Sequence, residues 1–196
     1  RVSELVIAAL NDFANARYCA GATAEGVNTY NAVDVTLGRG VPSPAPDLAR
    51  NFYTTSACGL CGKASIDAVR TSSSYAVDQD PMHVTEAMLT SFPELLRAEQ
   101  AIFDKTGGLH AAALFDGESG ALLVLREDVG RHNAVDKVIG WALKEDMLPL
   151  RGTVLMVSGR ASFELTQKAL MAGIPMLAAV SAPSSLAADL AAEMGL

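Results

Sequence analysis

Two cysteines separated by two residues, Cys58 and Cys61, form the most reactive motif of the sequence. A glycine follows each cysteine, and Lys63 stands two residues beyond the second, so we expect an open backbone with a cation near the thiols. The pattern predicts a helix over residues 64–69. A cation and a helix start both favour the thiolate form of cysteine. The motif therefore indicates a loop-borne nucleophile that passes a group between partners.

Two other uses of a C-x-x-C motif are weighed against this one. Zinc needs four ligands, and the sequence has no second C-x-x-C and no paired histidines. A redox pair of the thioredoxin type would need a strand before it, whereas residues 41–47, with Pro42, Pro44 and Pro46, predict an extended connector. We expect no metal, and a zinc protein stays an alternative. The residues left to complete such a site are scattered: Cys19, His83, His110 and His132.

A second chemical motif lies in residues 128–137, between a predicted strand and a predicted helix. Gly130 allows a tight turn, and Arg131, His132, Asn133 and Lys137 cluster at the helix start. Helix N–H groups and an arginine fork bind anions well. A solvated turn with a capping or core histidine is the other interpretation.

A third motif repeats this pattern in a predicted loop after the next strand. Ser158, Gly159 and Arg160 are followed by Ser162 at the expected start of a helix. Parallel strands open their carboxyl ends on one edge of a sheet, so both Gly-Arg loops are expected there. Together they predict one phosphate-bearing ligand between them.

The predicted elements form a mixed sheet covered by helices. Strands over residues 109–115 and 121–125 form a hairpin, and the strands over 153–157 and 174–180 alternate with helices, which favours parallel pairing. The fold class predicted is α/β, a three-layer α/β/α sandwich with a mixed sheet and a smaller N-terminal portion. The other predicted elements are helices over 5–16, 133–147, 162–171 and 184–194, a strand over 31–37, and a helix that starts at a Ser91–Glu94 capping box and stops at Gly107.

Composition excludes several function classes. The net charge is −7 and only 6% of residues are aromatic, which disfavours binding of nucleic acid through bulk charge or stacking. The longest apolar runs, such as residues 5–10, are too short to span a bilayer, and no secretory signal is visible. Three cysteines, an odd number, indicate a reducing cytoplasm rather than a disulfide framework.

Four motifs in order resemble the FdhD/NarQ family of formate dehydrogenase accessory sulfurtransferases. They are residues 50–63, 128–137, 158–164 and 182–187. The resemblance implies a cytidine deaminase-like fold, without the deaminase zinc ligands. It divides the chain into an N-terminal portion over 1–84, with the C-x-x-C loop, and a core over 85–196.

The resemblance implies a sulfurtransferase with a cysteine persulfide intermediate. Sulfur would come from a cysteine desulfurase and go to the molybdenum cofactor, Mo-bis(molybdopterin guanine dinucleotide), of formate dehydrogenase. A guanine nucleotide would mimic part of that cofactor. The resemblance also implies a homodimer.

Sequence position alone does not decide which cysteine carries the persulfide. The resemblance favours Cys58 as the carrier, with Cys61 assisting. Cofactor contacts are expected from Gly130, Arg131, His132, Asn133, Lys137, Ser158, Gly159, Arg160 and Ser162. The alternative function is a chaperone that holds the cofactor without transferring sulfur.

Overall fold

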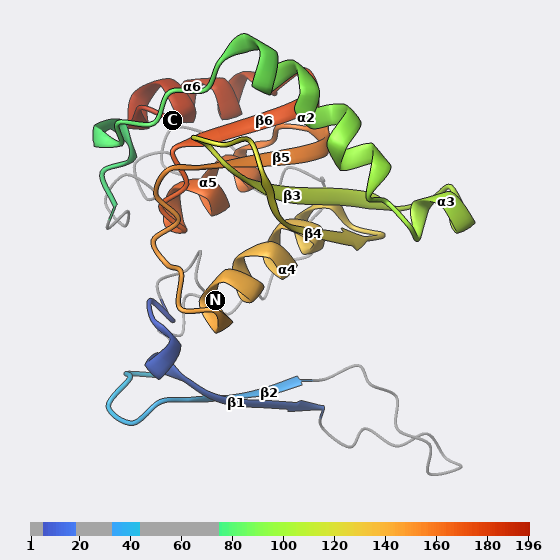
Figure 1. The fold of residues 1–196 in the computed structure, drawn as a ribbon. Helices are drawn as coiled ribbons and strands as arrows, with labels where there is room; N and C mark the ends of the chain where they lie inside the picture. Colours follow the sequence, from blue (N-terminus) through green and yellow to red (C-terminus); the bar gives the residue numbers. More distant parts are fainter. Residues whose placement is uncertain (1–5, 19–32, 44–74) are drawn as a thin grey trace.

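A four-stranded mixed sheet forms the centre of the molecule (Figure 1), in a computed structural model that describes residues 6–18, 33–43 and 75–196. Its order is β4-β3-β5-β6. β3 is antiparallel to β4, and β5 is parallel to β6, as the sequence predicts. β3 is also antiparallel to β5. The strands are β3 (His110–Asp116), β4 (Leu122–Asp128), β5 (Thr153–Arg160) and β6 (Met176–Ser181).

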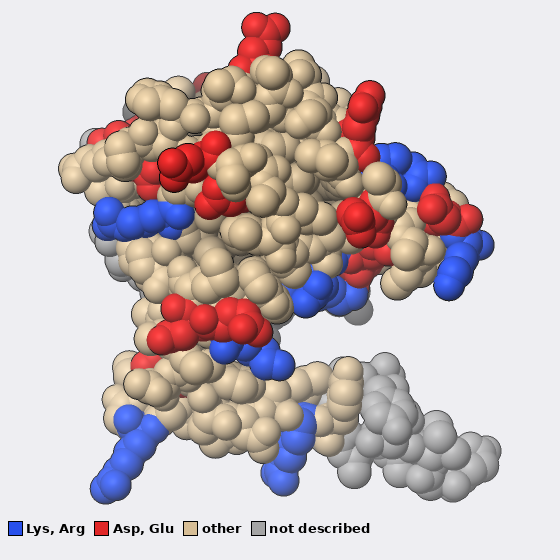
Figure 2. Space-filling view, in the orientation of Figure 1, with Lys and Arg blue, Asp and Glu red and all other residues tan. Residues whose placement is uncertain are grey.

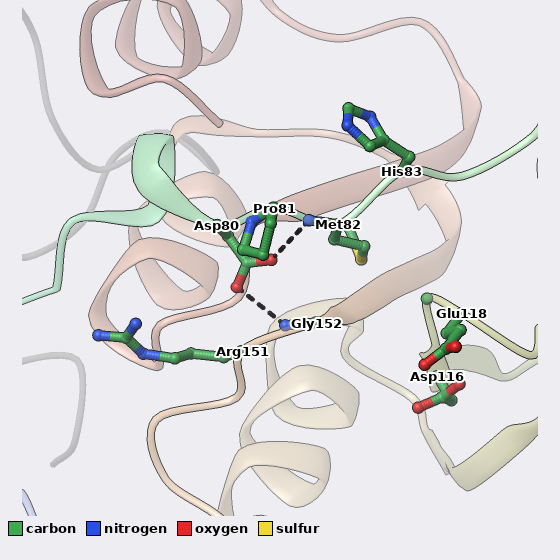
Figure 3. Close-up of a pocket in the computed structure, with 9 residues that line it drawn as sticks. Asp80, Pro81, Met82, His83, Asp116, Glu118, Arg151 and Gly152 are labelled. Atoms are coloured by element: carbon green, nitrogen blue, oxygen red, sulfur yellow. Dashed lines mark hydrogen bonds between the residues drawn. The ribbon is translucent and has the colours of Figure 1, made fainter.

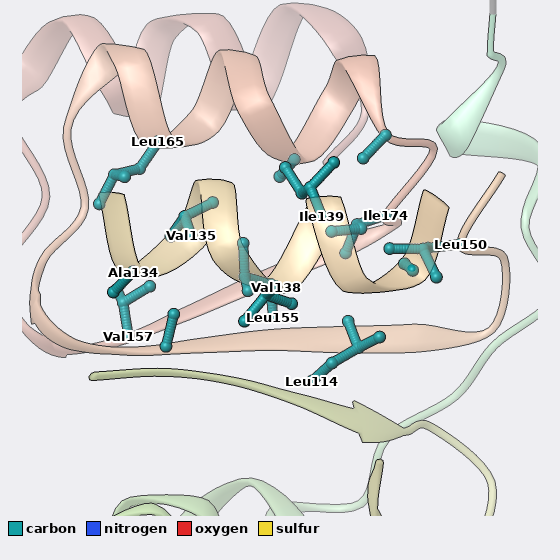
Figure 4. Close-up of a cluster of buried hydrophobic side chains, with 14 of the residues drawn as sticks. Leu114, Ala134, Val135, Val138, Ile139, Leu150, Leu155, Val157, Leu165 and Ile174 are labelled. Atoms are coloured by element: carbon teal, nitrogen blue, oxygen red, sulfur yellow. The ribbon is translucent and has the colours of Figure 1, made fainter. Parts of the chain in front are cut away.

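One face of the sheet is covered by α4 (Arg131–Lys144) and α5 (Phe163–Met171). Val135, Val138 and Ile139 recur at helical spacing and pack, fully or almost fully buried, onto Leu114 and Leu155 of the sheet (Figure 4). This cluster fixes α4, so it also fixes where the helix begins, at the carboxyl end of β4.

The other face of the sheet is covered by α2 (Glu86–Ala98). Phe92 stacks on Phe115 of β3 with ring centroids 4.3 Å apart. A further helix, α6 (Ser185–Met194), packs against α5 through Leu170 and Leu190. Helices therefore cover both faces of the mixed sheet, and the cytidine deaminase-like topology stays a prediction.

The remaining described elements are short. They are η2 (Leu10–Asp12), η4 (Val77–Gln79) and α3 (Phe103–Thr106). Gly107 ends α3 in the left-handed conformation, with φ of 65°. The sequence predicts Gly107 as the stop of a single helix from Ser91, whereas the structure has two helices, because α2 already ends at Ala98. Within the described ranges, no helix is long and apolar enough to cross a membrane.

The N-terminal region forms a small antiparallel sheet of β1 (Phe13–Tyr18) and β2 (Val33–Leu37). The predicted strand over 31–37 is confirmed for the described residues, but the predicted helix over 5–16 is wrong. Alanine content favours a helix locally, whereas here pairing with β2 decides the conformation. Val6 and Ile7 are buried against Leu143, which anchors this region to the end of α4.

The predicted start of α2 is also wrong. The helix begins after Thr85, whose hydroxyl accepts the N–H of Met88, so the cap lies six residues before Ser91. Ser91 instead donates to the carbonyl of Met88, and Pro93 lies inside the helix. The division of the chain at residues 84 and 85 stays a prediction.

Acidic and basic side chains are interspersed on the face of the molecule drawn in Figure 2. On this face an anionic ligand would therefore be held by individual cations rather than by a broad basic surface. Individual cations also lie at the carboxyl ends of β4 and β5.

Candidate functional site

The two Gly-Arg segments meet at one edge of the sheet. β4 and β5 run in the same direction because both are antiparallel to β3, so α4 and α5 begin at the same edge. The ring nitrogen Nε2 of His132 lies 3.3 Å from Oγ of Ser162. A Cβ added to Gly159 would lie 3.7 Å from Cδ of Arg131. The fold thus brings together residues about 30 positions apart in the sequence.

Asp128 organises the turn between β4 and α4. Its Oδ1 accepts the Gly130 N–H at 2.8 Å and the Asn133 side-chain amide at 3.1 Å. Its Oδ2 lies 2.6 Å from Nζ of Lys137, which also donates to the carbonyl of Glu127. The hydrogen bond from Lys137, followed by that from Gly130, lowers the pKa of Asp128 below its ordinary value of 3.8. Lys137 and Asn133 therefore build the turn.

Arg131 is the first residue of α4, and one edge of its guanidinium group makes no hydrogen bond to the described residues. Its Nε and Nη2 are buried and have no hydrogen-bond partner among the described residues. These two nitrogens point their N–H groups the same way, as a fork that matches two oxygens of a phosphate or carboxylate. A buried donor without a partner costs about 1–3 kcal/mol, so folded proteins seldom keep one. The edge is therefore suited to an anion that displaces the atoms covering it.

His132 follows Arg131 in α4, and its Nε2 faces two side-chain oxygens at the start of α5. Its Nε2 is 2.9 Å from Oε2 of Glu164, closer than the hydroxyl of Ser162. Burial lowers the pKa of His132 below 6.5, and the neighbouring Glu164 carboxylate opposes that shift. Burial therefore favours the neutral form of His132, and the Glu164 carboxylate favours the charged form.

The third motif is not the loop that the sequence predicts. Ser158, Gly159 and Arg160 are the last residues of β5, because Arg160 still pairs with Ser181 of β6 after a register shift that follows Val157. Ser158 is used by the sheet, since its Oγ accepts the N–H of Ala111 at 2.9 Å. Arg160 is exposed at the strand end.

Cys58, Cys61 and Cys19 lie outside the described residues, and so do the predicted helix over 64–69 and the connector beyond residue 43. Their roles and surroundings stay predictions. Among the residues that the structure does describe, no group of three or more His, Cys, Asp or Glu is placed to hold a metal ion.

Two residues of this edge were not expected from the sequence. Glu164 is recognisable only as an acidic residue in the first turn of a helix, and Asp128 only as a turn residue. Their partners in the site depend on the fold, because Glu164 contacts a histidine 32 positions earlier in the chain.

A cavity of about 460 Å³ lies at the opposite end of the sheet, where β3 ends and β5 begins (Figure 3). The Asp80 side chain joins two segments of the cavity wall. Its Oδ2 accepts the Gly152 N–H at 2.9 Å, and its Oδ1 accepts the Met82 N–H at 3.0 Å. The residues that line the cavity are Asp80, Pro81, Met82, His83, Asp116, Gly117, Glu118, Arg151 and Gly152.

The mixed sheet with helices on both faces defines an α/β protein, and the unpartnered edge of Arg131 lies where α4 begins, beside the start of α5. The family model of the FdhD/NarQ family matches residues 2–196, so the chain belongs to that family, as the sequence motifs predict. The relatives are longer than this chain, which spans about seven-tenths of the two bacterial relatives described next.

Three relatives carry the name sulfur carrier protein FdhD. The protein of Mycolicibacterium paratuberculosis is 60% identical over 195 residues, covering 100% of this chain and 71% of the relative. That of Streptomyces coelicolor is 63% identical over 196 residues, covering 100% of this chain and 69% of the relative. That of Saccharolobus solfataricus is 42% identical over 166 residues, covering 85% and 60% respectively.

A crystal structure described as a formate dehydrogenase accessory protein, from Desulfotalea psychrophila, matches the fold. Its TM-score is 0.64 with 22% sequence identity, and the match covers 98% of this chain and 66% of that one. The identity is low, so this match supports the fold alone.

Proposed function

We propose that this protein is a sulfur carrier that takes sulfur from a cysteine desulfurase and delivers it to the molybdenum cofactor of formate dehydrogenase. The name shared by relatives about 60% identical over the whole chain supports the sulfur-carrying half. The unpartnered edge of Arg131 is the single structural observation that supports the cofactor-binding half. The cofactor is the substrate of this reaction, and it carries phosphate groups on its guanine dinucleotide arms.

The loading step is a thiol–persulfide exchange. The thiolate of Cys58 attacks the outer sulfur of the desulfurase persulfide, a new S–S bond forms, and the old bond breaks. The desulfurase cysteine leaves as a thiolate, so charge and electrons balance. Lys63 and the predicted helix start keep the Cys58 thiol ionised enough to attack.

The release step uses the second cysteine. The thiolate of Cys61 attacks the inner sulfur of the Cys58 persulfide, forms a Cys58–Cys61 disulfide and releases hydrosulfide to the cofactor. Two thiols are oxidised while the transferred sulfur is reduced to sulfide, and a dithiol reductant then restores the pair.

The cofactor is held, in this proposal, by its phosphates at the starts of α4 and α5. Arg131 offers two parallel N–H donors, and the helix dipole of α4 adds to the attraction. Arg160, exposed at the end of β5, adds a weaker and more screened charge. Lys137 is already paired with Asp128, so its contribution is to hold the turn in place.

Intact-mass measurement tests the sulfur-carrying half. After incubation with a cysteine desulfurase and cysteine, the protein gains the mass of one sulfur atom, and the gain disappears on reduction. We expect no gain in Cys58→Ala and a retained gain in Cys61→Ala. A gain in Cys58→Ala and none in Cys61→Ala would reverse the roles.

A cofactor-binding chaperone is the alternative function, and the same experiment separates the two. A protein that gains no sulfur but still supports formate dehydrogenase activity with both cysteines replaced would be a chaperone. A homodimer and a location in the cytoplasm remain predictions from the family resemblance.

A further inference from the structure

Three side chains form a hydrogen-bonded cluster between the starts of α4 and α5. Nε2 of His132 lies 2.9 Å from Oε2 of Glu164 and 3.3 Å from Oγ of Ser162. Ser162 is 4% exposed, and the His132 and Glu164 side chains are 26% and 19% exposed. The cluster is thus shielded from water and joins the two helices beside Arg131.

Ser162 shows that this cluster replaces an ordinary helix cap. It is the N-cap residue of α5, yet its side chain makes no cap hydrogen bond. Ser184, the N-cap residue of α6, does accept a backbone N–H, that of Ala187. A serine cap normally stabilises a helix, and α5 lacks that contribution while the Ser162 hydroxyl lies near His132.

The 2.9 Å contact with Glu164 favours one position of the histidine proton. An ionised carboxylate only accepts hydrogen bonds, so the nitrogen that faces Glu164 must carry the proton. The other ring nitrogen, Nδ1, then has a lone pair and can accept a hydrogen bond. The charged groups around the ring have opposite effects on the pKa of His132. Arg131 and Lys168 lower it, whereas Glu164 and Asp136 raise it.

We propose that Glu164 is a positioning residue that fixes His132 with its proton on Nε2, so that Nδ1 accepts a hydrogen bond from a nucleotide whose phosphate pairs with Arg131. This inference rests on the proposed cofactor site and adds to it the residue that orients His132. Arg131 supplies only donors and Nδ1 only an acceptor. A guanine nucleotide carries phosphate oxygens together with hydroxyl and amide N–H donors, so it can pair with both groups, whereas fully ionised sulfate has no donor and can pair only with Arg131.

The proton position is tested by long-range ¹H–¹⁵N NMR of the histidine rings in the whole chain. At pH 7 we expect His132 to be neutral with its proton on Nε2 in the wild type. In Glu164→Ala we expect a mixture of the two proton positions. Glu164→Gln retains an accepting oxygen and should restore the wild-type pattern. A wild-type His132 with its proton on Nδ1 would overturn the inference.

Binding of GDP and of sulfate tests the selection of the ligand. We expect Glu164→Ala to weaken GDP about three- to tenfold, as expected for one lost neutral hydrogen bond, and to leave sulfate binding within about twofold. Glu164→Gln should recover most of the GDP affinity. The matched control is Glu86→Ala, which removes an exposed glutamate from the first turn of α2 and should change neither.

The outcomes separate this inference from the proposed function. If the wild type fails to bind GDP, the anion site itself is misplaced and both ideas fall. If the wild type binds GDP and Glu164→Ala binds it equally well, only the role of Glu164 is overturned. An equal loss of GDP and sulfate affinity would also overturn it, because that pattern reports a general distortion of the site.

Discussion

The two ends of the central sheet differ in whether their charged side chains have hydrogen-bond partners. At the end where β5 begins, the carboxylates of Asp80 and Asp116 accept hydrogen bonds from nearby residues, and Asp80 joins two segments of the chain. At the end where β5 stops, one edge of Arg131 has no such partner among the described residues. The carboxylates at the first end stabilise the fold, whereas the second end has two N–H donors of Arg131 without a partner among the described residues. A large cavity alone therefore does not mark the functional end of this sheet.

Replacing Asp80 should give the largest effect on stability. In Asp80→Ala the N–H groups of Gly152 and Met82 lose a charged acceptor, so we expect the free energy of unfolding to fall by about 1–3 kcal/mol. Urea denaturation measures this difference. Glu118→Ala, an exposed change in the same cavity, is the control and should stay within about 0.5 kcal/mol. Equal effects of the two changes would remove the structural role given to Asp80.

Replacing Arg131 should move stability the other way. Arg131→Met keeps most of the apolar stem and removes two buried donors that have no partner, so we expect the free energy of unfolding to rise by up to about 1 kcal/mol. Thermal and urea denaturation without ligand measure the change. A loss of more than about 1 kcal/mol would mean that the guanidinium supports the fold, and the contrast between the two ends would disappear.

Replacing Lys137 should have the smallest effect and should depend on pH. The lowered pKa of Asp128 stabilises the folded protein above the ordinary carboxyl pKa of 3.8, and this contribution is lost as the pH falls through the lowered pKa. Lys137→Met should therefore cost about 0.3–1 kcal/mol at pH 7, a small value because Lys137 is half exposed. The difference from wild type should shrink as the pH falls below 3.8 and through the lowered pKa of Asp128. A stability cost of Lys137→Met that is the same at pH 7 and at acid pH would show that loss of the Lys137–Asp128 pair does not cause it.

The sequence predicts the core of this fold well. The β3–β4 hairpin, the parallel β5–β6 pair and the helices between them follow from local hydrophobic patterns and turn residues such as Gly107 and Gly173. The failures occur where tertiary contacts override local preference. Residues 13–18 are alanine-rich yet pair as β1, and Ser91 resembles a cap but lies within a helix that Thr85 begins.

The candidate site is predictable in its composition but not in its hydrogen bonds. The repeated Gly-Arg pattern places Arg131 and Gly159 at one sheet edge, which the structure shows. The pairing of His132 with Glu164 and of Lys137 with Asp128 depends on side-chain directions that no sequence spacing fixes. For the same reason the sequence does not show that Lys137 is paired with Asp128, while two nitrogens of Arg131 have no partner among the described residues.

Calorimetric titration of GDP into three proteins tests the central claim most directly. The proteins are the wild type, Arg131→Ala and Arg151→Ala, the last removing an arginine from the cavity at the opposite end of the sheet. We predict that Arg131→Ala weakens GDP binding about tenfold to 150-fold, the loss expected for charge-assisted hydrogen bonds, and that Arg151→Ala stays within about twofold of wild type. Unchanged affinity in Arg131→Ala, or a comparable loss in Arg151→Ala, would contradict the placement of the cofactor site at the carboxyl ends of β4 and β5.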